Sequence, residues 1–153
     1  MEIAVLALGC FWGPEIKFGK LDGVIKTEVG YCGGNSDKTT YEKVCSGTTN
    51  HAEVVRLEFD PKIISYEKIL SYFFEIHDPT TLNQQGPDIG TQYRSAIYYN
   101  DSTQEVAAKQ SKEKNSTLFS GPIVTEITAA SKYYLAEDYH QKYLEKRGMG
   151  SCH

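Results

Sequence analysis

The chain has 153 residues, enough for one domain with a substantial core, and its 40% hydrophobic and 24% charged residues are ordinary globular proportions. A net charge of −4 without any run of Lys or Arg argues against a nucleic-acid-binding surface. No apolar stretch approaches membrane-spanning length, and the N-terminal run at residues 3–8 follows an acidic Glu2, unlike a signal peptide. Four cysteines without a Cys-x-x-Cys pair disfavour a structural zinc site and fit a reducing, cytoplasmic location.

The predicted elements follow one another without a linker that would divide the chain, so we expect one domain over residues 1–153. Ser65 is the expected N-cap of the second helix, and Ser102 with Glu105 forms an expected capping box for the third. Residues 78–92 are predicted to form a long loop, and residues 148–153 a mobile tail. Strands are predicted at residues 2–8, 24–30, 53–60, 95–99 and 123–129, and helices at 11–20, 65–76, 102–114 and 137–146.

The first six predicted elements read strand, helix, strand, strand, helix, strand. This order is typical of the split βαβ, ferredoxin-like unit, in which helices cover one face of the sheet. We therefore expect an α+β fold: a two-layer sandwich with a ferredoxin-like (split βαβ) core, elaborated by long loops. Hydrophobic periodicity alone leaves the order of the strands open.

One cysteine stands where the first predicted strand turns into the first predicted helix. Cys10 follows the apolar run, and Pro14 suits the first turn of a helix. The unpaired N–H groups and the positive end of the helix dipole favour a thiolate there. Phe11 and Trp12, the only Trp, come directly after it and provide an aromatic wall. On this local pattern Cys10 is either a nucleophile or a small buried hydrophobic residue, as most free cysteines are.

The segment Gly9-Cys10-Phe11-Trp12-Gly13 resembles the active-site signature of the type A peptide methionine sulfoxide reductases, and the resemblance extends from about Leu8 to Tyr143. It implies the α+β fold given above and the reduction of the S epimer of methionine sulfoxide, free or peptide-bound, to methionine. It implies no metal and no organic cofactor. The further matching segments, in the family's order, are Gly30-Tyr31-Cys32-Gly33-Gly34, Tyr41-Glu42-Lys43-Val44-Cys45-Ser46-Gly47, His51-Ala52-Glu53-Val54-Val55, Asp60-Pro61, His77-Asp78-Pro79, Gly90-Thr91-Gln92-Tyr93-Arg94-Ser95 and Ala136-Glu137-Asp138-Tyr139-His140-Gln141.

The resemblance implies a role for each of four catalytic residues. Cys10 is the nucleophile that attacks sulfur and is left as a sulfenic acid. Glu53 supplies a proton to the departing oxygen, which requires a carboxyl group whose pKa is raised. Tyr41 and Tyr93 donate hydroxyl hydrogen bonds to the same oxygen. Without the resemblance, Glu53 would be interpreted as a solvated residue at a strand edge, and each Tyr as a core residue.

Three residues are implied in substrate binding. Phe11 and Trp12 resemble the pair that encloses the substrate methyl group, although ordinary core packing is the alternative. Asp88 matches a position that helps to bind the backbone amide of the substrate, and its alternative is a turn residue. Ile89 departs from the amide or His that family members often have nearby, and this change would alter the rim of the site.

The remaining cysteines bear on how the enzyme is recycled. Cys152 resembles the C-terminal cysteine that many family members use as the resolving thiol, and a thioredoxin-like dithiol would then reduce the disulfide. Cys32 is a departure from the family pattern and stays open as a second thiol near the site. Cys45 is expected to be buried and inert.

His51, His77 and His140 are structural in the resemblance. Two other functions stay open: a Cys–His acyl hydrolase, which needs a His held against Cys10, and a non-enzymatic redox-sensing module that binds methionine-containing peptides. The expected partners are methionine sulfoxide and the dithiol reductant, with no nucleic acid and no membrane, and we expect a monomer.

Overall fold

The computed structural model describes residues 1–34, 44, 51–130, 133–137 and 140–141. The expected loop at 35–40, Tyr41, Cys45, most of the helix expected at 137–146, and the tail with Cys152 lie outside these residues.

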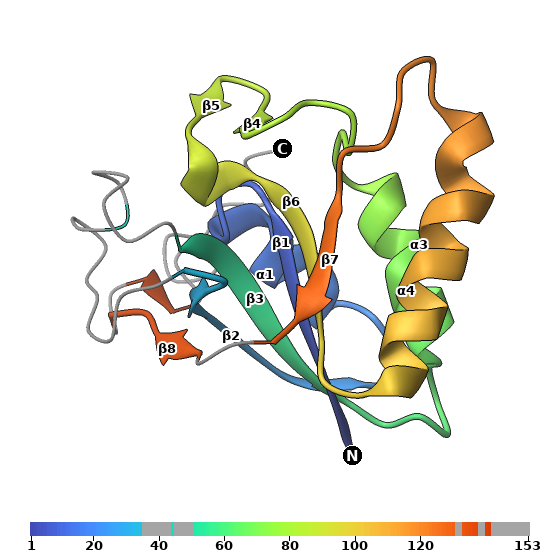
Figure 1. The fold of residues 1–153 in the computed structure, drawn as a ribbon. Helices are drawn as coiled ribbons and strands as arrows, with labels where there is room; N and C mark the ends of the chain where they lie inside the picture. Colours follow the sequence, from blue (N-terminus) through green and yellow to red (C-terminus); the bar gives the residue numbers. More distant parts are fainter. Residues whose placement is uncertain (35–43, 45–50, 131–132, 138–139, 142–153) are drawn as a thin grey trace.

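A six-stranded sheet forms the centre of the molecule, with the strand order β7-β6-β1-β3-β2-β8 (Figure 1). Neighbouring strands are antiparallel, except that β6 and β7 are parallel, so the sheet is mixed. The bounds are β1 Glu2–Leu8, β2 Val24–Cys32, β3 Ala52–Phe59, β6 Ser95–Tyr99, β7 Glu126–Ala129 and β8 Tyr134–Leu135.

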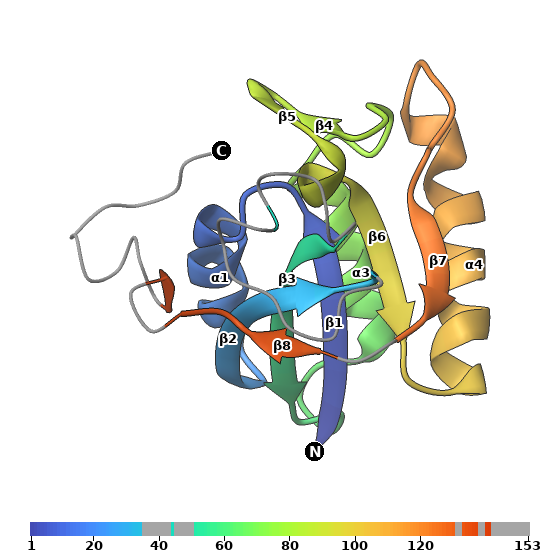
Figure 2. The same ribbon diagram turned by 60° about the vertical axis from the view of Figure 1, so that its left-hand side comes forward.

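Within the part of the chain that the structure describes, three α-helices cover one face of this sheet (Figures 1 and 2). They are α1 Trp12–Gly19, α3 Tyr66–Glu75 and α4 Ser102–Asn115, and the 3₁₀ turn η2 Ser116–Leu118 follows α4. The crossover through α1 joins β1 to β2, which run in the same direction with β3 between them. The crossover through α3 joins β3 to β6 in the same way, around β1. The α+β class is confirmed, and the ferredoxin-like core stays a prediction.

The two faces of the sheet are packed differently. Leu6, Leu57 and Phe73 belong to the main core between the sheet and the helices. Successive side chains of a strand point to opposite faces of the sheet. The residues next to Leu6 and Leu57 along their strands therefore point away from the helices, and a second apolar cluster lies on that face, which we call the outer face. That cluster consists of Val5, Ala7, Cys32, Ala52, Val54, Ala96 and Tyr98. Glu53 has the parity of Leu57 and therefore lies on the helix face, whereas Cys32 lies on the opposite face.

The structure corrects two details of the predicted helices and strands. Asp101, not Ser102, is the N-cap of α4, because the Asp101 carboxylate accepts the N–H of Gln104 at 2.8 Å while Ser102 is already helical. The last predicted strand, 123–129, is paired in β7 only from Glu126 onward. The N–H of Val124 donates to the carbonyl of Pro79 at 2.8 Å and so bonds to a loop rather than to β6.

The long loop expected at 78–92 contains short regular elements. The strands β4 Gln84–Gln85 and β5 Asp88–Ile89 pair as a hairpin, and the 3₁₀ turn η1 Thr91–Tyr93 follows. Within the part of the chain that the structure describes, no helix is both long and apolar enough to cross a membrane.

Candidate active site

The turn between β1 and α1 exposes Cys10. Gly9 adopts φ of +97°, a conformation that residues with a Cβ rarely take, and it redirects the chain at the end of β1. Phe11 is the N-cap residue of α1, so the thiol of Cys10 stands at the N-terminal end of the helix. Cys10 is partly exposed. Its position therefore combines access to solvent with the partial positive charge that favours a thiolate.

Cys10 opens into a pocket of about 630 Å³. One wall comes from the β1–α1 turn and α1, and the other from the β4–β5 hairpin, two parts of the chain that are some 70 residues apart in the sequence. The lining residues are Cys10, Trp12, Ile76, Gln85, Gly86, Pro87 and Asp88. The pocket therefore brings together three of the predicted site residues, Cys10, Trp12 and Asp88.

The side chain of Gln85 holds the hairpin against the end of α3. Its Oε1 accepts the N–H of Asp78 at 3.0 Å, and its Nε2 donates to the carbonyl of the same residue at 2.9 Å. Gln85 also pairs with Asp88 across the hairpin, so the position of Asp88 depends on this amide. Ile89, the next residue, is 73% exposed.

Glu53 is buried directly beside the turn that carries Cys10. Its side chain is 1% exposed, and Oε1 accepts the backbone N–H of Phe11, the residue after Cys10, at 3.3 Å. A solvated strand-edge position, the alternative from the sequence, is thereby excluded. The hydrogen bond joins β3 to the N-terminus of α1 and brings the carboxyl group close to the backbone that carries the thiol.

Tyr93 ends the turn η1, which packs against both β3 and β4. The turn therefore lies between the strand that carries Glu53 and the hairpin that carries Asp88. Tyr93 is partly exposed. The second predicted hydroxyl donor, Tyr41, lies outside the described residues.

Trp12 and Phe11 differ in their surroundings. The Trp12 ring lines the pocket and stacks on His140, with ring centroids 5.6 Å apart, and its Nε1 donates to His140 Nδ1 at 3.0 Å. Phe11 is 1% exposed and packs against Tyr31 and His140, at centroid distances of 5.8 and 5.3 Å. Burial lowers the pKa of His140, and the nearby Glu137 carboxylate partly opposes this. A neutral His140 is the form that accepts from Trp12.

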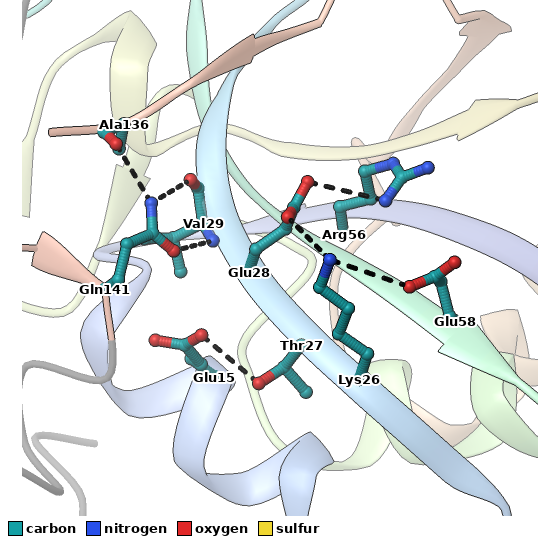
Figure 3. A network of polar contacts seen from close by, with 9 residues as sticks. All are labelled: Glu15, Lys26, Thr27, Glu28, Val29, Arg56, Glu58, Ala136 and Gln141. Carbon is teal, nitrogen blue, oxygen red and sulfur yellow. Dashed lines mark hydrogen bonds and ion pairs between the residues drawn. The ribbon is translucent and has the colours of Figure 1, made fainter. Parts of the chain in front are cut away.

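The segment that carries His140 is tied to the edge of β2 (Figure 3). The side-chain amide of Gln141 accepts the N–H of Val29 at 2.9 Å and donates to the Val29 carbonyl at 2.8 Å, so it pairs with β2 as another strand would. The Tyr31 hydroxyl donates to Glu137 Oε1 at 2.8 Å. The resemblance implies a structural role for His140, whereas its contact with Trp12 is visible only in the structure.

Figure 3 also shows charged side chains of β2 and β3 on the face of the sheet opposite the helices. Lys26 lies 3.8 Å from Glu28 and 3.9 Å from Glu58, and Arg56 lies 3.4 Å from Glu28. Because these charges are partly solvated, each pair contributes at most about 1 kcal/mol to stability. They cover the end of the sheet that is remote from Cys10.

The structure also places the other histidines and Cys32. His51 Nδ1 accepts the N–H of Gly34 at 2.9 Å, and His77 Nε2 lies 2.8 Å from Ser95 Oγ, so both rings join backbone segments as the resemblance implied. Cys32 is 0% exposed and belongs to the second apolar cluster, on the face of the sheet opposite the helices. Among the described residues, no group of three or more His, Cys, Asp or Glu side chains could hold a metal ion.

A family model described as peptide methionine sulfoxide reductase matches residues 2–153. The peptide methionine sulfoxide reductase MsrA of Pelagibacter ubique is 68% identical over 148 residues, which cover 96% of this chain and 100% of that protein.

Two solved structures of Mxr1 from Saccharomyces cerevisiae are also similar. The reduced form has a TM-score of 0.92 and 38% identity, covering 99% of this chain and 88% of that chain. The form in complex with Trx2 has a TM-score of 0.67 and 26% identity, covering 93% of this chain and 84% of that chain.

Proposed function

This chain belongs to the peptide methionine sulfoxide reductase family, and from that premise we propose which residues carry out the reaction, on which epimer, and how the enzyme is recycled. The protein is an enzyme that reduces methionine sulfoxide to methionine at the expense of thiols. The observation that carries the proposal is the buried Glu53 carboxyl, which is bonded to the N–H that follows Cys10.

In the first step, the Cys10 thiolate attacks the sulfur of the sulfoxide, and Glu53 gives a proton to the oxygen. The sulfur–oxygen bond of the substrate breaks, methionine leaves, and Cys10 holds the oxygen as a sulfenic acid. One thiolate, one proton and one sulfoxide thus yield one sulfenic acid and one thioether. The substrate sulfur gains the two electrons that Cys10 loses.

The substrate is held at its oxygen, its methyl group and its backbone. Tyr41 and Tyr93 donate hydrogen bonds to the oxygen, where negative charge develops. Trp12 provides the apolar surface for the methyl group, with Phe11 packed behind it. Asp88, on the opposite wall of the pocket, accepts the backbone N–H of the substrate. This chiral arrangement selects the S epimer, free or within a peptide.

In the second stage, a resolving thiol condenses with the sulfenic acid and releases water. We assign this thiol to Cys152, which leaves a Cys10–Cys152 disulfide. A thioredoxin-like dithiol then exchanges with the disulfide and restores both thiols. The yeast relative in complex with Trx2 supports this class of reductant. The enzyme functions as a monomer, and a thioredoxin-like partner fits a reducing cytoplasm.

The test follows dithiothreitol-driven reduction of the two epimers of a blocked methionine sulfoxide separately. The expected result is rapid formation of methionine from the S epimer and little from the R epimer, with one dithiothreitol oxidised per methionine. Equal rates for the two epimers would contradict the proposed arrangement of Trp12, Glu53 and Tyr93.

Cys10→Ser is the control, because a hydroxyl is a far weaker nucleophile toward sulfur than a thiolate. The variant is expected to fold and to have no turnover. Activity above about a tenth of the wild-type rate would show that another thiol is the nucleophile. Release of an acid or amine without oxidation of dithiothreitol would indicate a hydrolase instead.

A further inference from the structure

Arg94, which follows Tyr93 directly, joins three segments of the chain. Its side chain is buried, and its guanidinium group donates from Nη1 to the carbonyl of Thr91 at 2.8 Å and from Nη2 to the carbonyl of Gly33 at 3.3 Å. Nε donates to Oε2 of Glu126 at 3.3 Å. Because the guanidinium plane carries its N–H groups in a fixed arrangement, these bonds fix the angles between the acceptors as well as their distances.

The bond to Thr91 closes the turn that carries Tyr93. Thr91 is the first residue of η1, and its carbonyl also accepts the backbone N–H of Arg94, at 3.3 Å. One carbonyl therefore receives both the backbone and the side chain of Arg94. The three residues of η1 are held between these bonds, so the direction in which Tyr93 leaves the backbone depends on the guanidinium group.

The bond to Gly33 holds one side of a peptide group whose other side is held by His51. Nη2 of Arg94 donates to the carbonyl of Gly33, while the N–H of Gly34, in the same peptide group, donates to His51 Nδ1 at 2.9 Å. In a trans peptide the C=O and N–H point in opposite directions. The Gly33–Gly34 peptide is thus fixed between the two side chains, and its orientation cannot change without breaking one of these bonds.

The backbone at Gly33 permits this close arrangement. Its φ is +83°, and a Cβ at this position would lie 2.3 Å from the hydroxyl oxygen of Tyr98. His51 is 1% exposed and stands two residues before Glu53. A continuous series of bonds therefore runs from the Tyr93 turn through Arg94, the Gly33–Gly34 peptide and His51 to the start of the strand that carries Glu53.

We propose that Arg94 is a positioning residue of the reductase reaction, which sets the Tyr93 hydroxyl relative to the Glu53 carboxyl through the Thr91 carbonyl and the Gly33–Gly34 peptide. The inference rests on the proposed function, because Tyr93 and Glu53 are the groups that act on the sulfoxide oxygen. A misplacement of about 1 Å in such a group is enough to slow a reaction by about 10²-fold.

A purely structural role would act instead through Glu126. That residue belongs to β7 and pairs in register with Ala96 of β6, and its side chain is more exposed than that of Arg94. Glu126→Gln removes the ion pair and leaves both carbonyl bonds of Arg94 in place. It is therefore the matched control for the loss of charge pairing alone.

The experiment is a double-mutant cycle on the single-turnover rate of methionine formation, with Arg94→Lys, Tyr93→Phe and the double variant. The single ammonium of Lys cannot bond to both carbonyl groups in the fixed geometry of Arg. We expect Arg94→Lys to be slower by about tenfold or more, and the double variant to be no slower than Tyr93→Phe by more than about twofold. Glu126→Gln should remain within about twofold of wild type.

A wild-type rate for Arg94→Lys beside a slow Tyr93→Phe would overturn this inference alone, as would losses that multiply in the double variant. A wild-type rate for Tyr93→Phe would overturn the role of Tyr93 in the proposed function and this inference with it. If Arg94→Lys does not fold by circular dichroism, Arg94→Gln in the Glu126→Gln background removes both charges together. The same non-additive loss with Tyr93→Phe is expected there, and its absence would overturn the inference.

Discussion

The backbone N–H of Phe11 donates to Oε1 of Glu53 across a separation of 42 residues, at 3.3 Å. The bond ties the residue that follows Cys10 to the central part of the sheet. It uses an N–H at the start of α1 that has no partner within the helix. The same contact that fixes the start of α1 thus places a buried carboxyl group next to the backbone of Cys10, the proposed nucleophile.

Glu53→Gln should slow methionine formation by about 10²-fold or more, because an amide cannot give the proton to the departing oxygen. The amide oxygen can still accept the N–H of Phe11, so the fold should persist. The loss should be larger at alkaline pH than at acid pH, where solvent can partly protonate the sulfoxide. Single-turnover rates over a range of pH, with folding followed by circular dichroism, measure this.

Glu15→Gln is the matched control for this prediction. Glu15 is also buried, 2% exposed, and its carboxylate accepts the Thr27 hydroxyl at 3.2 Å from the first turn of α1. It has no role in the proposed reaction, so its amide variant should keep the wild-type rate. A Glu53→Gln enzyme as fast as wild type at every pH would show that the proton comes from another group.

The bond from Trp12 to His140 predicts a dependence of stability on pH. Burial lowers the pKa of His140 below its ordinary value of 6.5, so the unfolded chain binds a proton at a higher pH than the folded chain does. The neutral His140 ring contributes fully to the free energy of unfolding above about pH 6.5, and this contribution is lost as the pH falls toward the lowered pKa of His140. The free energy of unfolding in urea should therefore decrease over that range.

Trp12 is the only Trp in the chain, so its fluorescence reports on the His140 ring beside it. A titration should show a change with its midpoint below 6.5, where protonated His140 no longer accepts from the indole N–H. His140→Asn is the control, since its Oδ1 can accept the same bond without titrating in this range. A midpoint at or above 6.5 would contradict the prediction.

Gly33→Ala should destabilise the protein by about 2 kcal/mol or more, because it combines an unfavourable backbone conformation with a steric clash against Tyr98. Gly86→Ala is the control for the backbone term alone: φ there is +56°, but no atom lies within 4 Å of the added Cβ. Its cost should be about 1 kcal/mol. Equal losses for the two variants in urea unfolding would show that the contact with Tyr98 is unimportant.

Much of the fold could be predicted because its signals are local. The apolar run of β1 gave the observed bounds, 2–8, and Ser65 is the N-cap of α3, where its hydroxyl accepts the N–H of Lys68 at 3.1 Å. The cap of α4 was placed one residue late, since Asp101 and Ser102 are both good capping residues and only the backbone conformation distinguishes them. The strand β8 has only two residues, too few to show a hydrophobic periodicity, so the sequence does not predict it.

Sequence patterns predict those parts of the candidate site that lie within one short segment, but not the contacts between distant segments. Cys10 and Trp12 stand in one short segment with a recognisable pattern, whereas the bond from Trp12 to His140 spans 128 residues and the bond from Arg94 to Gly33 spans 61. No periodicity or propensity encodes such pairs. Arg94 was part of a matching segment, but its contribution became visible only when the acceptors of its guanidinium group were known.

Cys152, and not Cys32, should resolve the sulfenic acid, because Cys32 is poorly placed to reach Cys10. Cys32 is 0% exposed on the outer face of the sheet, whereas the strand neighbour Tyr31 shares the helix face with Phe11. A disulfide needs the two Cα atoms within about 7 Å and side chains that point toward each other. Because Cys32 is buried on the face of the sheet opposite the helices, its side chain points away from the start of α1, so we expect Cys152 to form the disulfide with Cys10.

Treatment of the protein with methionine sulfoxide without a reductant, followed by mass spectrometry, identifies the disulfide. A Cys10–Cys152 link is the expected result, and Cys152→Ser should reduce one equivalent of substrate but should not be recycled by thioredoxin. Cys32→Ala is the control and should keep the thioredoxin-dependent rate, because a small apolar side chain replaces a buried thiol. A Cys10–Cys32 link, or normal recycling of Cys152→Ser, would assign the resolving role to another thiol.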